Sequence, residues 1–486
     1  MSARQTVRER WILGSFAVFA MAWAITRAAV QSITVDEAGT YNMFVARHLY
    51  LSYAANNHIL NSTLMYGFTR LLGPSQFTVR LPALIGAAFY ITAAYRLCRL
   101  LGASLLVQVT IFVCLVFNPF IFDHLVAARG YGLALGFLMW AIVYPARWHL
   151  EGHLKDRESL LVACAVSSLC AGLSVDANFS FAFVNVATMT AIFLFARSLR
   201  PQDWTDLLAA CVLPAAALIA IVSAGALLDL HPGELIYGAR SLGEEFASII
   251  ESSLFQTRFD FLMPIVFPLV GVTGVLWLSY LLLRRAKAKI ALLGWAATAI
   301  FVVTVALHWL VFRLFGLLLP KDRTAIYLFP LFMIVAGVLA AIPPASRLGR
   351  YLHACFIGAL TVMAAYFLLC LRLTYFKEWL WDADVQKTYS VLACLNQANQ
   401  VTHVASSWSY HAPLNFYQRI QPTSMQEIDE KFDPQQTQVY VVDTFHTPED
   451  LQGKDLKIFY RSPITDLVLA ASPPLADTLA SGSCIH

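Results

Sequence analysis

The sequence predicts an all-α polytopic membrane protein with about eleven transmembrane helices and a small C-terminal extracytoplasmic α/β domain. Two observations predict this class. Of the 486 residues, 58% are hydrophobic and only 13% are charged, which is too apolar for a water-soluble chain of this length. Runs of roughly 20 apolar residues also recur along the chain, and this is the length of helix that crosses a hydrocarbon core about 30 Å thick.

The predicted spans begin with residues 11–30. This run follows three arginines and shows no obvious small-residue cleavage site, so we interpret it as a retained span and not as a signal peptide. The other ten runs lie at 79–101, 104–121, 125–145, 159–174, 178–196, 207–228, 261–283, 288–311, 325–342 and 351–371. Residues 1–372 are thus predicted to form the transmembrane domain, with outer-face loops at 31–78, 122–131, 229–260 and 312–324.

The distribution of charge sets the predicted orientation. If the N-terminus is cytoplasmic, the loops on that side hold 16 of the 34 Lys and Arg residues but only 6 of the 30 Asp and Glu residues. Cytoplasmic loops of membrane proteins carry such an excess of basic residues. We therefore expect a multi-pass protein of the inner (plasma) membrane with a cytoplasmic N-terminus. The net charge of +4 indicates topology and does not indicate nucleic acid binding.

The composition changes after the last span, and residues 373–486 are predicted to form the extracytoplasmic α/β domain. A polar, amphipathic helical stretch comes first, and short β-rich runs such as QVYVVD and LKIFYRS follow between turn residues. Cys394 and Cys484 are the two cysteines of this domain. Either they form a disulfide that joins the end of the domain to its first helix or they remain thiols, and the sequence leaves both alternatives open.

Two adjacent carboxylates follow the first span in the stretch TVDEAGTY. Thr34 and Glu37 have the spacing of a capping box, in which each side chain satisfies a backbone amide at a helix start. That cap explains Glu37 but does not require Asp36. Asp36 is therefore the stronger candidate for a catalytic base or a metal ligand, and the alternative is a solvated acid at the membrane edge.

A second outer loop reads FNPFIFDHLVAARGYGLALGF. It offers Asp123 and His124 as metal ligands, and Arg129 with Tyr131 as groups that bind a phosphate. The competing interpretation is that Asp123 caps a helix and that the other residues anchor the chain at the membrane interface.

A third outer loop, PKDRTAIYLFPLF, presents Lys321 and Arg323 just before the tenth predicted span. Two cations at this depth suit a phosphate at the level of the headgroups. Snorkelling of the two side chains toward lipid headgroups explains them equally well.

The three loops, in this order, resemble the GT-C class of membrane glycosyltransferases, especially the dolichyl-phosphate-mannose and aminoarabinose-transferase-like group, and are similar to glycosyltransferase family 39. In that group an acid in the first loop precedes a stretch similar to NNHILNSTLMYGFTRLLGPSQFTVRLPALIG, where His58 occupies a His or Pro-rich turn. AARGYGLALGF is similar to the group's Arg-Pro-Tyr motif, and KDRTAIYLFPLF to a late Arg-Tyr element. Two departures are that Gly130 stands in place of the usual Pro and that Ala127 and Ala128 stand where an acid is often found.

The resemblance implies a transferase that moves a sugar from a polyprenyl-phosphate donor to a lipid, polysaccharide or protein acceptor on the outer face. It implies a catalytic role for Asp36, with Glu37 beside it. The implied substrate-binding residues are His58, Arg129, Tyr131, Lys321 and Arg323. Mg²⁺ or Mn²⁺, if the reaction uses one, would be held by Asp36 with Asp123 or His124, and a reaction without metal stays open. The implied partners are the donor, the acceptor and membrane lipids, with no nucleic acid.

A polytopic transporter or a lipid flippase of glycan precursors is the main alternative, and a structural subunit of a polymer-assembly machine is another. The predicted spans hold almost no charged residue in mid-membrane, whereas transporters place such residues along their substrate path. Because the candidate residues gather instead in the outer loops, the pattern favours an enzyme.

Overall fold

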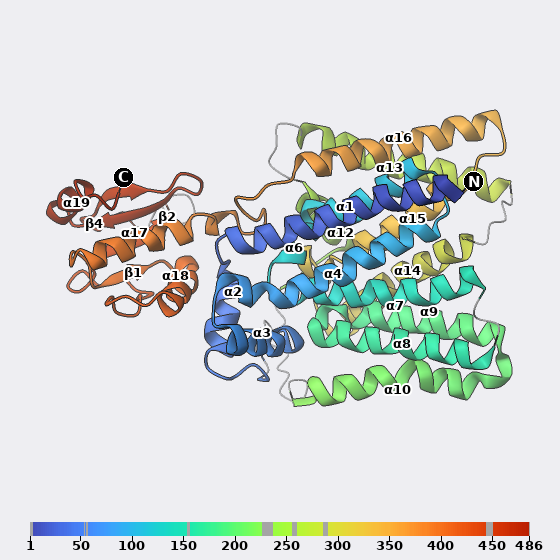
Figure 1. Ribbon diagram of the computed structural model, residues 1–486, viewed down its shortest axis with the longest axis horizontal. Coiled ribbons are helices and arrows are strands. Elements are labelled where there is room, and N and C mark those ends of the chain that lie inside the picture. Colours follow the sequence, from blue (N-terminus) through green and yellow to red (C-terminus); the bar gives the residue numbers. More distant parts are fainter. Residues whose placement is uncertain are drawn as a thin grey trace. The chain divides into compact units, whose positions relative to one another are not determined.

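The computed structural model describes residues 3–52, 54, 57–152, 156–225, 237–254, 260–284, 290–443 and 451–485 (Figure 1). The chain folds into two compact units, each made of separate stretches of sequence. Unit 1 comprises Met1–Ile25, Leu51–Asn61 and Pro82–Leu371, and unit 2 comprises Thr26–Tyr50, Ser62–Leu81 and Arg372–His486.

Long apolar helices make up unit 1, and α1 and α4 continue from it into unit 2. Among the described residues, eight helices are long and apolar enough to cross a membrane. They are α1 (Ala3–Val30), α4 (Gln76–Leu100), α8 (Arg157–Ala177), α9 (Ala182–Leu199), α10 (Trp204–Val222), α13 (Met263–Leu283), α14 (Ala291–Phe315) and α16 (Arg347–Leu369). The sequence thus forms a polytopic helical membrane protein, as predicted.

Three predicted spans look different in the structure. The third is a pair of helices, α5 (Leu105–Phe117) and α6 (Pro119–Val126), bent by 56°, which raises the number of spans to nine at most within the described part of the chain. α7 (Tyr131–Glu151) has 21 residues, and α15 (Leu328–Ala341) has only 14. A helix therefore occupies each of the eleven predicted positions, although length and composition alone do not qualify all of them as spans.

The predicted boundary between the third and fourth spans is wrong. Residues 119–126 form α6 instead of entering a loop at 122, and α7 begins at Tyr131 instead of 125. The physical reason is Asn118, whose side chain accepts hydrogen bonds from the amides of Phe120 and Ile121 and so starts a new helix, with Pro119 in its first turn.

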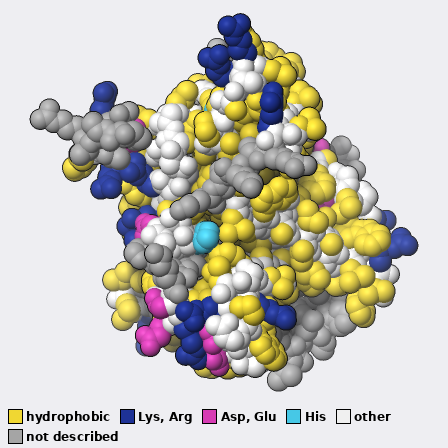
Figure 2. Space-filling model, turned by 90° about the vertical axis from the view of Figure 1, so that its right-hand side faces the viewer, with side chains coloured by type: hydrophobic (Ala, Val, Ile, Leu, Met, Phe, Trp, Pro, Cys, Tyr) yellow, Lys and Arg dark blue, Asp and Glu magenta, His cyan; other side chains and the backbone are white. Residues whose placement is uncertain are grey.

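The helices of unit 1 pack closely. α8 contacts both α7 and α10, α14 contacts α9 and α15, and α16 contacts α13 and α5. Glycines allow close approach: a Cβ atom at Gly86 of α4 would lie 2.3 Å from the carbonyl carbon of Gly132 in α7. Hydrophobic side chains also cover much of the outer surface. Figure 2 shows such a face, broken by separate groups of Lys and Arg side chains.

Shorter elements join or cover these helices. They are η2 (Phe179–Phe181), η3 (Pro201–Asp203), α12 (Leu242–Ser253), η5 (Asp260–Leu262) and η6 (Asp322–Ala325). α12 lies within the predicted outer loop 229–260, of which residues 237–254 and 260 are described, and it packs against α6 and η6.

Unit 2 is built around a four-stranded sheet in the order β1-β2-β4-β3. The strands are β1 (Val404–Ser406), β2 (Val439–Asp443), β3 (Lys457–Arg461) and β4 (Leu467–Ala471). The helical elements of unit 2 are α2 (Val35–Thr40), η1 (Tyr41–Val45), most of α3 (Ile59–Leu72), η7 (Leu380–Asp382), α17 (Val385–Gln397), α18 (Trp408–Ile420) and α19 (Pro473–Ala480). β1 pairs with β2 in parallel, and the other pairs are antiparallel. The C-terminal α/β domain is present as predicted. A disulfide joins Cys394 to Cys484, which decides between the two alternatives.

The first outer loop belongs to unit 2, which differs from the predicted division of the chain at 372/373. Hydrogen bonds explain the difference. The Ile33 amide donates to the Tyr417 hydroxyl over 2.9 Å, and the Ser32 hydroxyl donates to the Ala383 carbonyl over 2.8 Å. The acidic loop is therefore folded onto the C-terminal domain and does not form a separate loop of the transmembrane domain.

Candidate active site

Glu37 lies in the first turn of α2, where the predicted capping box is confirmed. Its backbone amide donates to the Thr34 hydroxyl over 3.2 Å, and the Thr34 amide donates to Glu37 Oε2 over 3.0 Å. The helix is short, and the cap fixes its start at Val35, so that residues 36 and 37 are carried in a defined turn.

Arg80 forms a buried ion pair with Glu37 that sequence reasoning did not predict. Its Nε donates to Glu37 Oε1 over 2.9 Å and its Nη2 to Oε2 over 2.7 Å, and both side chains have no exposed surface. The same guanidinium donates to the carbonyls of Ala28, Gln31 and Ser32, at the end of α1 and in the turn after it. Both carboxylate oxygens of Glu37 are thus used in holding α1, α2 and α4 together, and its contacts are those of a structural residue.

Asp36 is half-buried beside this ion pair. The indole Nε1–H of Trp379, a residue that is 1% exposed, donates to Asp36 Oδ2 over 3.2 Å. The Thr40 hydroxyl donates to the Asp36 carbonyl over 2.9 Å, one turn along α2. A carboxylate held in one orientation in this way can act as a general base.

Asp382 is a second acid of this region that the sequence analysis missed. Its Oδ2 accepts a hydrogen bond from the Val35 amide over 2.7 Å, and its side chain is only 1% exposed. Burial raises the pKa of Asp382 well above its ordinary value, the Val35 hydrogen bond lowers it, and the charges of Asp36 and Glu37 raise it further. The only sequence signal for it was its place directly after the last span.

In unit 1, three predicted site residues form an aromatic cluster. The ring of Tyr131 lies edge-on to those of His58 and His124, with centroids 5.6 Å and 5.0 Å away. His124 Nδ1 is 2.9 Å from the carbonyl of Phe120 in the preceding turn of α6. Because a carbonyl only accepts, Nδ1 carries a proton in this contact.

Gly130 shapes this cluster. It has φ +75°, and a Cβ atom there would lie 2.2 Å from the Ala177 carbonyl oxygen and 3.0 Å from the Cβ of His58. Proline cannot take this conformation because its ring fixes φ near −65°. The departure from the Arg-Pro-Tyr pattern thus has a structural reason in this chain.

The other second-loop candidates are buried around the same turn. Arg129 is 4% exposed and Asp123 is 2% exposed. Asn61 helps to fix the turn, because its side-chain amide donates to the Ala128 carbonyl over 3.0 Å. The structure thus brings His58, His124 and Tyr131 together, with Arg129 and Asp123 beside them in the chain.

The late loop is packed against α12 of unit 1. Lys321 Nζ donates to Glu244 Oε1 over 2.9 Å, so its charge is already paired. The Asp322 amide donates to the Ser248 hydroxyl over 2.9 Å. Arg323 is half-buried, with its guanidinium carbon 5.8 Å from the centre of the Tyr237 ring.

The arrangement of possible metal ligands gives little support to a metal site. Among the described residues, no group of three or more His, Cys, Asp and Glu side chains is placed to hold a metal ion. Asp36 belongs to unit 2, whereas Asp123 and His124 belong to unit 1. These residues do not make up a site of three protein ligands within either unit, and we derive no step through a metal ion. Use of Mg²⁺ or Mn²⁺ stays a prediction.

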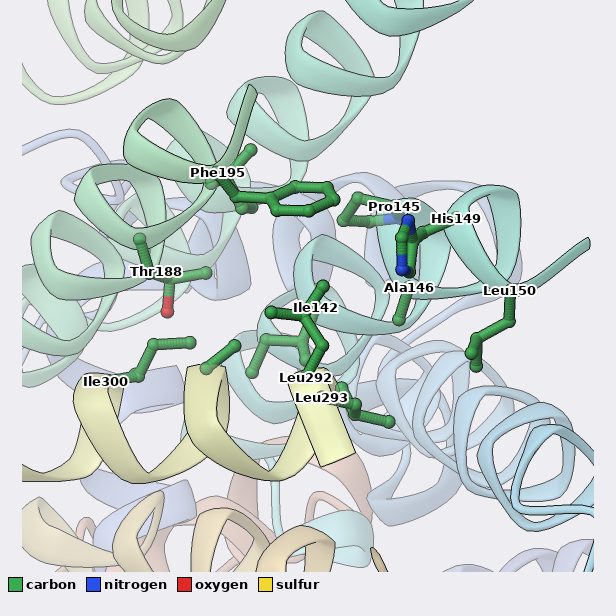
Figure 3. A pocket seen from close by; sticks show the side chains of 13 residues that line it. Ile142, Pro145, Ala146, His149, Leu150, Thr188, Phe195, Leu292, Leu293 and Ile300 are labelled. Atoms are coloured by element: carbon green, nitrogen blue, oxygen red, sulfur yellow. The ribbon is translucent and has the colours of Figure 1, made fainter. Parts of the chain in front are cut away.

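An apolar cavity of about 90 Å³ lies between α7, α9 and α14 (Figure 3). Ile142, Phe195 and Leu293 line it, and His149 and Thr188 are the polar side chains among its walls. His149 stands at the opposite end of α7 from Tyr131. The cavity is therefore remote from the candidate site residues of unit 1. Its apolar walls suit a hydrocarbon chain and not a reacting group.

These features define the class of fold: a polytopic helical membrane domain with a small C-terminal α/β domain. Two solved structures to which it is similar are of ArnT from Cupriavidus metallidurans. The structure of ArnT bound to undecaprenyl phosphate aligns with a TM-score of 0.52 and 11% identity over 99% of this chain and 100% of that one. The structure of ArnT in the apo state aligns with a TM-score of 0.49 and 12% identity over 97% of this chain and 99% of that one. No protein-family model and no curated protein matches the sequence. The likeness shows the fold and confirms the predicted resemblance at that level.

Proposed function

We propose that the protein is an integral-membrane glycosyltransferase that moves a sugar from a polyprenyl-phosphate donor to a lipid, polysaccharide or protein acceptor on the outer face of the membrane. The observation that carries the proposal is Asp36. It is an acid placed directly after the first span, and the Trp379 indole holds one of its oxygens at 3.2 Å within a GT-C-type fold. The similar fold of ArnT, solved with undecaprenyl phosphate bound, supports a polyprenyl phosphate as the donor's lipid.

In the proposed reaction, an acceptor hydroxyl attacks the anomeric carbon of the donor sugar. The bond between that carbon and the phosphate oxygen breaks, its electron pair leaves with the polyprenyl phosphate, and the hydroxyl proton passes to Asp36. General base catalysis of this kind contributes roughly 10²- to 10⁴-fold. Cations near the leaving phosphate stabilise its growing negative charge.

The residues of unit 1 supply the remaining proposed roles. Arg129 and Arg323 are the proposed phosphate binders, because a guanidinium binds phosphate oxygens in pairs. His58 and Tyr131 are proposed to bind substrate through the aromatic cluster they share with His124. We give Lys321 a lesser part because Glu244 pairs its charge at 2.9 Å.

We also propose that the C-terminal domain lies outside the cytoplasm, with the N-terminus inside. The disulfide between Cys394 and Cys484 supports this orientation, because disulfides persist in oxidising compartments and are rare in the cytosol. An alkaline phosphatase reporter fused after residue 486 should be active, and a cytoplasmic reporter such as green fluorescent protein at the same place should be dark. The reverse result would contradict the orientation.

The test of function compares lipid-linked sugars and surface glycans by mass spectrometry in cells with and without the gene. Cells without it should accumulate a polyprenyl-phosphate sugar and lose one glycan modification. The wild-type gene should restore both profiles, and Asp36→Asn, expressed at the same level, should restore neither. Unchanged profiles in the deletion strain would refute the transferase. If the lipid-linked sugar instead accumulates on the cytoplasmic leaflet, the transporter or flippase is the correct assignment.

A further inference from the structure

The segment after the last span reaches the acidic turn of α2 at two neighbouring positions. Trp379 donates its indole N–H to Asp36 Oδ2 over 3.2 Å, and three residues later Asp382 accepts the amide of Val35 over 2.7 Å. Val35 and Asp36 are the first two residues of α2, so one contact fixes the backbone of the turn and the other fixes the carboxylate that it carries.

This segment is itself firmly held. The Phe376 ring meets Trp379 edge-on at 6.0 Å, and the guanidinium carbons of Arg27 and Arg80 lie 4.8 Å and 5.1 Å from the centre of the same ring. Trp379 and Asp382 are each 1% exposed. Neither side chain can leave its position without opening a packed region, which is the property required of a group that orients another.

We propose that Trp379 and Asp382 are positioning residues that the C-terminal domain contributes to the proposed active site. The inference rests on the proposed role of Asp36 as the base. The Trp379 N–H holds Asp36 Oδ2 and thereby fixes the orientation in which the Asp36 carboxylate meets the acceptor. Asp382 holds the Val35 amide and thereby the turn. The carboxylate of Asp36, in the first outer loop, is thus oriented by the part of the chain that is synthesised last.

Asp382 performs this role as an uncharged carboxylic acid. Within the described residues its Oδ1 has no hydrogen-bond partner, and the only contact of its Oδ2 is the Val35 amide. An anion placed there would be buried beside two other carboxylates, while the guanidinium of Arg80 is already engaged by Glu37. Its raised pKa agrees with this state. The titratable and charged groups that face it include Asp36 and Glu37 from α2, Arg80 from α4 through Glu37, and Tyr410 from α18.

The first experiment removes single donors and acceptors and leaves the shape unchanged. The polyprenyl-phosphate sugar that accumulates in deletion cells serves as donor, and unmodified lipid, polysaccharide or protein from the same cells supplies the acceptor. The purified full-length protein is added, and release of polyprenyl phosphate is measured against pH. Trp379→Phe should lower kcat about tenfold, the effect of losing one hydrogen bond to a charged group. It should leave KM for the donor within about twofold, and it should move the acid limb of the profile to higher pH because the charged form of Asp36 loses a donor. Trp408→Phe, in an exposed tryptophan of α18, is the matched control and should change nothing.

A pair of variants tests Asp382. Asp382→Asn keeps an uncharged acceptor for the Val35 amide and should retain at least half of kcat, whereas Asp382→Ala should lose about tenfold or more, since an amide at the reacting turn is then unpaired. Asp384→Asn is the control, because Asp384 accepts amides of Ile464 and Thr465 and makes no contact with α2 that the structure records. Equal activity of Asp382→Asn and Asp382→Ala would overturn the role of Asp382.

A readout without enzyme activity separates this inference from the proposed function. In protein labelled with ¹⁵N at the tryptophan indoles, Trp379→Phe identifies the Trp379 N–H resonance, and Asp36→Asn should shift it while leaving that of Trp408 in place. No shift overturns the inference, whatever the activity. If Asp36→Asn abolishes transfer but Trp379→Phe leaves kcat and the acid limb unchanged, the inference fails and the proposed function stands. If Asp36→Asn transfers sugar at the wild-type rate, the proposed base and the inference fail together.

Discussion

The acidic turn of unit 2 and the Gly130 turn of unit 1 both carry predicted site residues, but different forces hold them. The first turn is held by charge and hydrogen bonding: Arg80 clasps Glu37, and Trp379 and Asp382 contact Asp36 and Val35. The second turn is held by close packing, which is so tight that no Cβ atom fits at Gly130. A turn held by an ion pair should lose stability when a charged side chain is replaced by an uncharged one of similar size. A turn held by close packing should instead lose stability when one carbon atom is added.

Arg80→Met should cause the largest loss of stability. It leaves the Glu37 carboxylate buried without its cation, and breaking a buried ion pair costs about 3–5 kcal/mol. Unfolding by sodium dodecyl sulfate in mixed micelles measures the change. The double variant Glu37→Gln/Arg80→Met should lose less than the sum of the two single variants. Strictly additive losses would show that Arg80 acts through its bonds to the carbonyls at the end of α1 and in the turn after it, and not through Glu37.

Glu245→Gln tests whether unit 1 also depends on charge. Glu245 in α12 is fully buried, and burial raises its pKa from 4.5 to about 7. In the folded state Glu245 therefore keeps its proton up to about pH 7, whereas in the unfolded state it releases the proton near pH 4.5. The free energy of unfolding is thus highest at low pH and falls by about 3 kcal/mol as the pH rises through this window. Melting temperatures at pH 5 and pH 8 should differ less for Glu245→Gln than for the wild type. Glu251→Gln, exposed on the same helix, should keep the wild-type difference.

Gly130→Ala tests the contact-held turn directly, and the other end of α7 supplies its control. Gly152 has φ +82°, close to the +75° of Gly130, but a Cβ atom there meets nothing within 4 Å. Gly152→Ala should cost about 1 kcal/mol for the left-handed backbone alone. Gly130→Ala should cost roughly 2 kcal/mol more, because the backbone oxygen of Ala177 must move. Equal losses in the two variants would mean that the turn has room to adjust.

Lys321→Met should have the smallest effect. The Lys321–Glu244 pair has a distance similar to that of Arg80–Glu37, but its side chains are 34% and 40% exposed. Exposed ion pairs contribute about 0–1 kcal/mol, so the unfolding free energy should change by less than about 1 kcal/mol. A loss as large as that of Arg80→Met would break the distinction between buried and surface charge on which the comparison depends.

The sequence predicted the features that depend on local pattern. Hydropathy placed a helix at every predicted span because a helix in lipid satisfies its own backbone groups. The capping box at Thr34 followed from spacing alone. The break at Asn118 was missed because the apolar run continues through it, and only the cap separates α5 from α6.

Contacts between distant parts of the chain were beyond local pattern. Arg80 was noticed only as part of a motif, and nothing near it in the sequence names Glu37 as its partner, 43 residues away. Trp379 and Asp382 lie 343 and 347 residues from the groups that they contact. In the sequence an indole and a carboxyl after the last span resemble any interfacial anchor, so their role depends on the fold of unit 2.

The hydrogen bond between the Ile33 amide and the Tyr417 hydroxyl has a consequence for the order of synthesis. Its two residues are 384 positions apart. A ribosome that adds about 5–20 residues per second needs about 20–80 s to make that length of chain. Throughout this interval the acidic loop is outside the cytoplasm in the proposed orientation, and the Ile33 amide lacks its partner. A chain that stops before Trp379 also lacks both groups that contact Val35 and Asp36, so in the proposed mechanism the acid has no support until most of the protein has been made.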